Sequence, residues 1–266
     1  MNGIRIILPG MFTMANLACG FGSILISNRF HDIGSAARMR NLTEAVWLIV
    51  LAAFFDFLDG MVARFSRSSS RIGVELDSLA DIVSFGVAPA VLIVNFSLIS
   101  RGNWAWILAF AFVMAGSFRL ARFSLSATLE EKLNFVGLPI PAAAGAIVTY
   151  ILFSIEVWGE IRFEKFFIIL LIGTTVLMVS TIEYETMPKF DLSKLKDRIK
   201  VLFLFLVAIA ITVNASLVMF PLVLSYILYG LSKMVLMVVT GVGRATFQYP
   251  AGIFKRGDKE KDNEEE

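Results

Sequence analysis

Four aspartates lie within a short stretch of a chain that is otherwise mostly apolar. They form two pairs, because Asp56 and Asp59 are three residues apart and Asp77 and Asp81 are four residues apart. Helical residues at these spacings share a face, so each pair would present two carboxylates on one side of a helix. Carboxylate oxygens are the ligands that Mg²⁺ and Mn²⁺ prefer. The pattern therefore predicts a divalent-cation site between two helices.

The residues between the two pairs are suited to bringing their helices together. The segment from Arg64 to Asp77 is long enough for the chain to turn, and the small residues Gly60, Ala63 and Gly73 would leave room for a bulky polar substrate.

A carboxylate at membrane depth is costly unless its charge is compensated, so an aspartate inside an apolar helix indicates a functional role. Two other interpretations are solvated interfacial aspartates paired with nearby arginines, and the ion-coupling carboxylates of a transporter.

The composition predicts an all-α, multi-pass integral membrane protein. Of the 266 residues, 57% are hydrophobic and 17% are charged, whereas soluble domains carry about a quarter charged residues. A single cysteine, Cys19, excludes a disulfide framework and a cysteine-rich zinc site. A single histidine, His31, excludes a catalytic triad or metal site built on several histidines. We expect the lipid bilayer as the environment of the chain and no nucleic acid as a partner.

Apolar runs of about 20 residues can cross a bilayer as helices, and the sequence predicts about eight. They cover approximately residues 11–27, 43–64, 74–99, 104–123, 137–157, 163–181, 201–219 and 221–239. The first is interpreted as a retained helix rather than a signal peptide. The third is expected to be interrupted near Gly86 and Pro89, and Pro139 and Pro141 are typical of a helix start.

These runs predict three parts of the chain. Residues 1–190 would form a membrane core with six helices, residues 191–240 a C-terminal helix pair, and residues 241–266 a charged cytoplasmic tail. With eight spans and the N-terminus inside, most Lys and Arg residues fall on the cytoplasmic side, as positively charged loops prefer. The aspartates would then lie near the cytoplasmic ends of the second and third helices, where a water-soluble substrate can reach them.

The whole acidic stretch also resembles a known signature. Residues 56–81 match D-x2-D-G-x2-A-R-x8-G-x3-D-x3-D, the signature of the CDP-alcohol phosphotransferases, at every specified position. The resemblance implies phosphoryl transfer from a CDP-linked substrate, with two divalent cations, Mg²⁺ or Mn²⁺, as cofactors. It also implies that Asp56, Asp59 and Asp77 are metal ligands. Asp81 would be the general base and would also touch one metal.

The resemblance assigns a nucleotide pocket as well. The residues expected to bind the CDP moiety near the aspartates are Gly60, Ala63, Arg64 and Ser70. A guanidinium at Arg64 would suit a diphosphate. Thr13 and Asn16 in the first helix could hydrogen-bond the cytosine or the ribose, or could equally serve as polar contacts between helices.

Four further stretches resemble the phosphatidylserine synthases of this family. They are residues 8–21, 81–90, 118–123 and 135–144, and the likeness continues to about residue 190. It implies transfer of the phosphatidyl group of CDP-diacylglycerol to L-serine, with release of CMP. Arg119 and Arg122 are the candidates for binding the serine carboxylate. The same two residues could instead follow the positive-inside rule or bind lipid phosphates.

Several alternatives stay open on sequence grounds. A sibling enzyme would use glycerol 3-phosphate or inositol phosphate, which would also require arginine. An ion-coupled transporter would not release CMP, and a non-catalytic scaffold would tolerate Asp81→Asn. The sequence does not distinguish diacyl from archaeal ether lipids. A homodimer is the expected assembly, by analogy with the sibling enzymes.

Overall fold

The protein is described by a computed structural model that covers residues 2–29, 35–66, 71–96, 104–128, 137–182 and 195–240. No strand occurs among these residues, in agreement with the predicted all-α fold. The helices are α1 (Asn2–Ser27), α2 (Ser35–Ser66), α3 (Arg71–Asp81), the π-helix η1 (Ile82–Val87), α4 (Ala88–Asn95), α5 (Trp104–Thr128), α6 (Ile140–Trp158), α7 (Glu164–Val179) and α8 (Leu195–Thr240).

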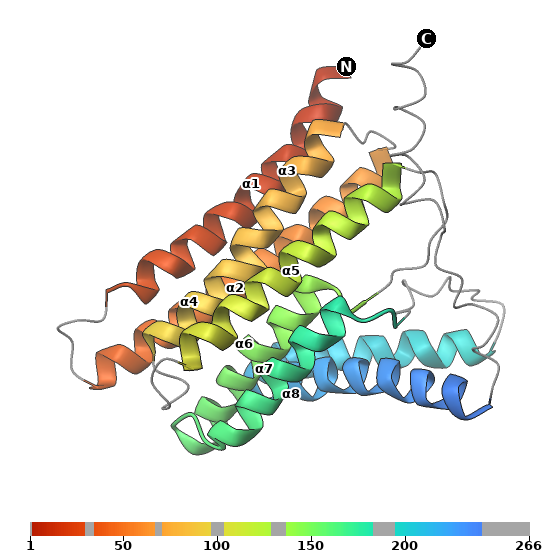
Figure 1. Cartoon of the computed structure of the whole chain (residues 1–266). Helices are drawn as coiled ribbons and strands as arrows, with labels where there is room; N and C mark the ends of the chain where they lie inside the picture. The colour runs from red at the N-terminus through yellow and green to blue at the C-terminus, as the bar shows by residue number, and fades with distance from the viewer. Residues whose placement is uncertain are drawn as a thin grey trace, which may run out of the picture. The chain divides into compact units, whose positions relative to one another are not determined.

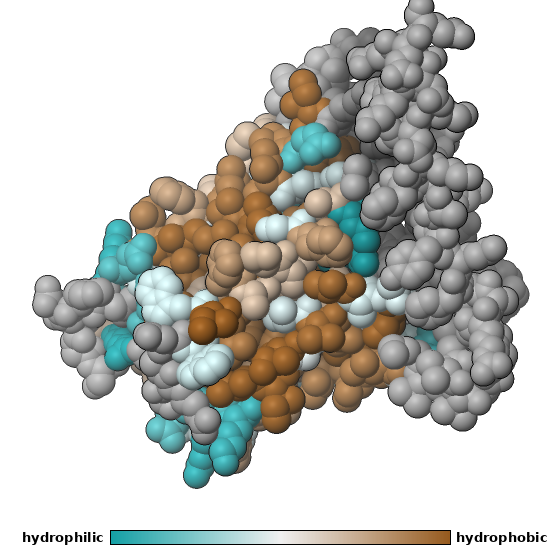
Figure 2. Space-filling model, viewed as in Figure 1, coloured by the Kyte–Doolittle hydropathy of each residue, from teal (hydrophilic) through white to brown (hydrophobic). Residues whose placement is uncertain are grey.

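Six segments of the described chain are long and apolar enough to cross a membrane. They are Gly10–Ser27, Ala36–Ala63, Ile72–Asn95, Trp104–Ser124, Ile140–Trp158 and Ile209–Lys233. α7 is not among them because it has 16 residues, about 24 Å of helix against a hydrocarbon core of about 30 Å. The prediction of eight spans is therefore not confirmed. Figure 2 shows the wide apolar surface that lipid-facing helices require.

α1 turns its polar face inward and its apolar face outward. Its buried positions follow helical spacing and carry small or polar side chains, namely Thr13, Asn16, Gly20, Ser23 and Ser27. Its exposed positions include Met14, Phe21 and Leu25. A water-soluble helix would show the opposite arrangement. The pattern places lipid on the outside of α1 and neighbouring helices on its polar side.

The polar face of α1 packs against α2 on one side and against α3, η1 and α4 on the other. The last three follow one another without a gap, so they form one rod beside α1 in Figure 1. The predicted interruption near Gly86 and Pro89 is a change of helix type rather than a break, since Gly86 lies in η1 and Pro89 in the first turn of α4. Pro lacks a backbone N–H, and the first turn is where that N–H is dispensable.

Gly20 allows α1 and η1 to approach closely. A Cβ atom at this position would lie 2.3 Å from Ser84 Oγ and 2.6 Å from Ser84 Cα. At the other end of the rod, Asn95 Nδ2 donates to the Ser27 carbonyl at 3.1 Å, and Arg38 Nη2 donates to the Phe96 carbonyl at 2.9 Å. These bonds satisfy carbonyls at helix ends, which otherwise lack partners. They fix the positions of α1 and α2 along the axis of the rod.

Several helix boundaries differ from the prediction, and α1, for example, begins at Asn2 rather than near residue 11. α2 begins at Ser35, so residues 35–41, which were expected in a connection, are helical. The break expected near residue 220 lies instead at Asn214, where α8 has non-helical backbone angles (φ −153°, ψ 91°). The Leu217 N–H donates to Asn214 Oδ1 at 3.2 Å, so Asn214 is the N-cap of the second segment of α8.

α6 is the most enclosed helix of the second half of the chain. It begins as predicted, with Pro139 at the N-cap and Pro141 in the first turn. Tyr150 and Phe153 of α6 contact the ring of Phe220 in α8, at centroid distances of 5.2 and 5.5 Å. The chain forms two compact units, Met1–Ile227 and Leu228–Glu266. The candidate site lies entirely in the first.

Candidate active site

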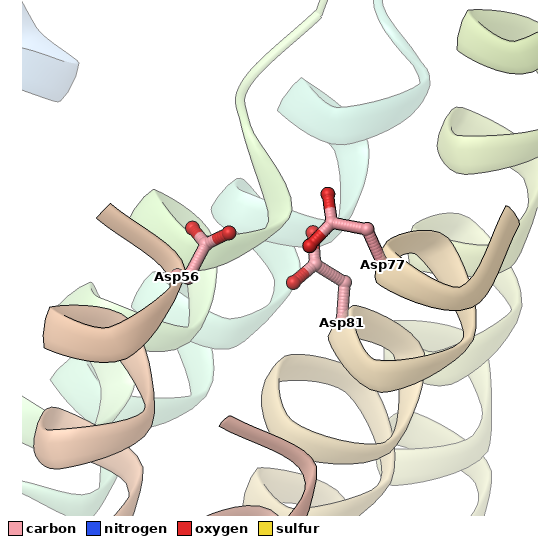
Figure 3. Close-up of side chains that lie close together, drawn as sticks. All are labelled: Asp56, Asp77 and Asp81. Carbon is pink, nitrogen blue, oxygen red and sulfur yellow. The ribbon is translucent and has the colours of Figure 1, made fainter. Parts of the chain in front are cut away.

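Three of the four aspartates meet where α2 faces α3. Asp56 lies near the C-terminal end of α2, and Asp77 and Asp81 lie one turn apart at the C-terminal end of α3. One carboxylate oxygen from each lies within 4.8 Å of the other two. Figure 3 shows Asp56 pointing from one helix toward the two carboxylates of the other. The structure therefore brings these three predicted residues together.

Asp59 is close by but is oriented differently. Its side chain is 7% exposed, and Oδ2 accepts a hydrogen bond of 2.6 Å from Thr13 Oγ1 of α1. The other oxygen, Oδ1, is buried and has no hydrogen-bond partner among the described residues. Asp59 does not belong to the group of oxygens within 4.8 Å. Its predicted role as a metal ligand stays a prediction.

Asp81 is also tied to α1. Its carboxylate is 8% exposed, and Oδ1 accepts a hydrogen bond of 3.2 Å from Asn16 Nδ2. Ser84, in the next turn of the rod, donates from Oγ to the backbone carbonyl of Asn16 at 3.0 Å. Ser84 lies in the stretch 81–90 that resembles the phosphatidylserine synthases, but that likeness assigned it no role. Two hydrogen bonds thus join Asn16 of α1 to the rod, one to Asp81 of α3 and one to Ser84 of η1.

The acidic cluster fits a cation. Arg40 and Glu44 form an ion pair at 3.4 Å, and it involves none of the four aspartates. One oxygen each of Asp59 and Asp77 is buried and lacks a hydrogen bond among the described residues. Like charges held this close repel one another unless a positive charge lies between them. An all-oxygen donor set is the kind that Mg²⁺ and Mn²⁺ prefer.

Arg119 of α5 lies beside this cluster. Its side chain is 7% exposed, and its Nε has no hydrogen-bond partner within the described residues. A charged neighbour is Asp81, and Tyr226 of α8 lies nearby. Sequence reasoning missed Tyr226, since it lies in a helix without any recognised motif. A buried guanidinium with unused donor capacity is suited to binding an anionic ligand.

Arg122, the second predicted serine-binding residue, contacts the end of α7. Its Nη1 and Nη2 donate to the carbonyls of Val179 and Ser180, at 3.4 and 3.3 Å. Gly137, with φ +87°, lies against the same end of α7, since a Cβ atom there would lie 2.5 Å from the Met178 carbonyl oxygen and 3.1 Å from that of Ser180. Arg122 therefore holds the C-terminal end of α7 against α5. Its predicted contact with serine is not tested by these bonds.

The predicted nucleotide pocket is only partly described. Gly60 and Ala63 lie in the last turns of α2, just beyond Asp59, and open space adjoins the Cα of Gly60. Arg64 continues the same helix, but its side chain lies outside what the structure describes, and Ser70 lies outside the described residues. Thr13 and Asn16 make contacts between helices. Their predicted contact with the nucleotide stays a prediction.

Comparison with known proteins gives the same result as the signature. Residues 6–180 match the CDP-alcohol phosphatidyltransferase family. This chain belongs to that family. The match includes the four aspartates, Arg119 and Arg122.

Relatives of the family with defined names are similar over most of their length. A CDP-diacylglycerol–serine O-phosphatidyltransferase of Helicobacter pylori (strain J99) is 32% identical over 88% of this chain and 93% of its own length. The protein of the same name from Bacillus subtilis is 34% identical over 71% of this chain and 96% of its own length. An archaetidylserine synthase of Methanothermobacter thermautotrophicus is 38% identical over 70% of this chain and 71% of its own length.

Proposed function

We propose that this chain is a CDP-diacylglycerol–serine O-phosphatidyltransferase, an integral membrane enzyme that makes phosphatidylserine and CMP. The observation that carries the proposal is the meeting of Asp56, Asp77 and Asp81 within 4.8 Å, at the signature positions of a family to which the chain belongs. The names of the relatives supply the acceptor, serine.

We propose that the aspartates hold two divalent cations, Mg²⁺ or Mn²⁺. The ligands would be Asp56, Asp59, Asp77 and Asp81. Bound divalent ions neutralise a diphosphate and act as Lewis acids at phosphorus. The fit rests on the close carboxylate oxygens and on the buried, unpartnered oxygens of Asp59 and Asp77.

Asp81 is the proposed general base. The serine hydroxyl must lose its proton as its oxygen attacks the lipid-side phosphorus of CDP-diacylglycerol. A carboxylate oxygen of Asp81 accepts that proton, the new P–O bond forms to serine, and the P–O bond to CMP breaks. CMP takes the electron pair of that bond and leaves, while phosphatidylserine stays in the bilayer. Phosphoryl transfer needs mainly positioning and charge neutralisation, which a cluster held by three helices supplies.

Arg119 is the proposed partner of the serine carboxylate. Its guanidinium is buried beside Asp81 and retains a donor without a partner among the described residues. A charge-assisted hydrogen bond from this position would hold serine with its hydroxyl near the base. Gly60, Ala63, Arg64 and Ser70 would bind the CDP moiety at the end of α2. The two acyl chains would enter between helices from the lipid phase.

We propose that the site faces the cytoplasm, where a soluble nucleotide and serine are available. The basic residues of the 64–71, 119–132 and 189–200 segments support this orientation. α7 would complete a six-helix core within residues 1–190, α8 would supply the C-terminal pair within residues 191–240, and residues 241–266 would form the cytoplasmic tail. A homodimer is the proposed assembly.

The proposal is tested by CMP release from purified protein supplied with CDP-diacylglycerol and Mn²⁺ or Mg²⁺. Serine, glycerol 3-phosphate and inositol phosphate are added in separate reactions. We expect release with serine alone and its loss in Asp81→Asn, because general bases contribute about 10²–10⁴-fold.

Other outcomes have defined meanings. Release with another alcohol would retain the transfer reaction and replace serine as the acceptor. Absence of release with every acceptor, in protein that is folded, would favour the transporter or scaffold. A parallel reaction with an archaeal ether-linked CDP-lipid tests which lipid type the enzyme uses. This test is needed because one relative is an archaetidylserine synthase.

A further inference from the structure

Thr13 and Asn16 each contact one aspartate of a different pair. They lie one turn apart on the buried face of α1. Thr13 donates to Asp59 of α2, and Asn16 donates to Asp81 of α3. Thus a single turn of α1 reaches both carboxylate pairs.

We infer that Thr13 and Asn16 are positioning residues, which orient Asp59 as a metal ligand and Asp81 as the base. This inference rests on the proposed function and its metal site. It differs from the first of the two sequence interpretations, in which both side chains hydrogen-bond the cytosine or ribose, and it gives the second, polar contacts between helices, a specific role.

The hydrogen bond from Thr13 leaves one carboxylate oxygen of Asp59 available to a metal ion. Its hydroxyl occupies Oδ2 at 2.6 Å, and Oδ1 is buried without a partner among the described residues. A carboxylate that ligates a metal is commonly held by a hydrogen bond to its second oxygen. Thr13 thereby fixes the rotation of the carboxylate, and Oδ1 is the atom directed to a cation.

The Asn16 contact fixes Asp81 in the same manner. A carboxylate can only accept, so the amide nitrogen of Asn16 must face it, as observed at 3.2 Å. The backbone of Asn16 is itself held by Ser84 Oγ, and the absent side chain of Gly20 permits this approach. Asn16 is therefore anchored to the rod that carries the base, and Asp81 keeps its second oxygen for the proton of the acceptor.

The experiment for Thr13 measures Mn²⁺ binding to full-length protein without nucleotide, by electron paramagnetic resonance. We expect Thr13→Val to weaken Mn²⁺ binding by about 10–100-fold, as loss of such supporting contacts does, and Thr13→Ser to restore it. Ser23→Ala is the matched control, since Ser23 lies on the same buried face about 15 Å along α1 from Thr13. Unchanged Mn²⁺ affinity in Thr13→Val would overturn the role of Thr13.

The experiment for Asn16 separates positioning from nucleotide binding. We expect Asn16→Leu to lower kcat by about 10²-fold, because small displacements of a catalytic group have effects of this size. CMP affinity at saturating Mn²⁺ should change less than twofold. Weaker CMP binding with an unchanged kcat would instead assign Asn16 to the nucleotide.

Failure of the proposed function would be recognised separately. Wild-type protein that binds Mn²⁺ but releases no CMP with serine would overturn the reaction and leave the Thr13 contact testable by metal binding. Wild-type protein that releases CMP yet binds no Mn²⁺ would overturn the metal site and the inference together. Thermal unfolding of each variant in detergent confirms that loss of binding is not loss of fold.

Discussion

At the scale of single residues, the site is a set of acidic side chains whose combined negative charge exceeds the positive charge that the described residues place beside it. Asp56, Asp77 and Asp81 converge, and Arg119 is the nearby cation that interacts with Asp81. Each unpartnered buried oxygen carries a desolvation cost that a ligand can remove. The cluster is therefore organised for what it binds rather than for the stability of the free chain.

Asp77→Asn should weaken Mn²⁺ binding by more than the roughly 10–100-fold expected from loss of a supporting contact. The substitution removes the negative charge and one candidate ligand oxygen while keeping the shape of the side chain. Glu75→Gln is the control, because Glu75 is an exposed acidic residue two positions away in α3. Calorimetric titration of both variants with Mn²⁺ measures the difference. Equal affinities in the two variants would remove Asp77 from the metal site.

Substitution of Arg119 and substitution of Arg122 by glutamine should have different effects. Arg119→Gln should raise KM for serine at least about tenfold, the lower end of what a hydrogen bond to a charged group contributes, and leave KM for CDP-diacylglycerol within twofold. Arg122→Gln should instead lower the thermal stability, because it loses bonds to the Val179 and Ser180 carbonyls. Steady-state kinetics and thermal unfolding test both. A raised KM for serine in Arg122→Gln would support its predicted role in binding serine.

At the scale of helices, the site depends on how closely α1 approaches the rod of α3, η1 and α4. The spacing of the aspartates predicted that carboxylates of two helices would meet, because helical periodicity is a local property. It could not predict that Thr13 would hold Asp59, since the two are 46 residues apart. The N-cap at Asn214 had a local signal, as Asn favours that position, but the apolar runs 201–219 and 221–239 placed the break near residue 220.

Gly20→Ala should destabilise the protein by about 1–3 kcal/mol or more, the range for overpacking a well-packed interior. The new methyl group would meet Ser84 Oγ at 2.3 Å and the Ser84 backbone at 2.6 Å. Gly22→Ala is the matched control, because its nearest contact would be Leu48 Cδ1 at 3.4 Å. Thermal unfolding in detergent compares the two. Equal stability would show that α1 and η1 can separate without cost.

At the scale of the whole molecule, membrane and catalysis impose opposite demands on the same helices. The faces toward lipid are apolar, as Phe54, Trp106 and Phe110 show by their exposure, and the faces toward the site are polar. Composition predicted the first property, since 57% of residues are hydrophobic. The number of spans was harder to predict, because α7 is short and α8 bends at Asn214 rather than near residue 220.

The proposed orientation can be tested with single cysteines in a Cys19→Ser background. Glu160→Cys, between α6 and α7, should react with a membrane-impermeant maleimide added to intact cells. Glu75→Cys, at the site end of α3, should react only after the membrane is permeabilised. Both parent residues are exposed. The reverse labelling pattern would place the aspartates outside the cytoplasm.

The π-helix η1 changes the angular position, about the rod axis, of the residues that follow it. A π-turn takes up about one residue more than an α-turn, and one residue corresponds to roughly 100° of rotation about the axis. α4 therefore continues the direction of α3 while presenting a different azimuth to its neighbours. Lengthening or shortening η1 by one residue would leave Asp77 and Asp81 in place and turn the wrong side of α4 toward α1 and α5. The wide turns after Asp81 thus let the carboxylates of α3 point into the site while the correct side of α4 packs against α1 and α5.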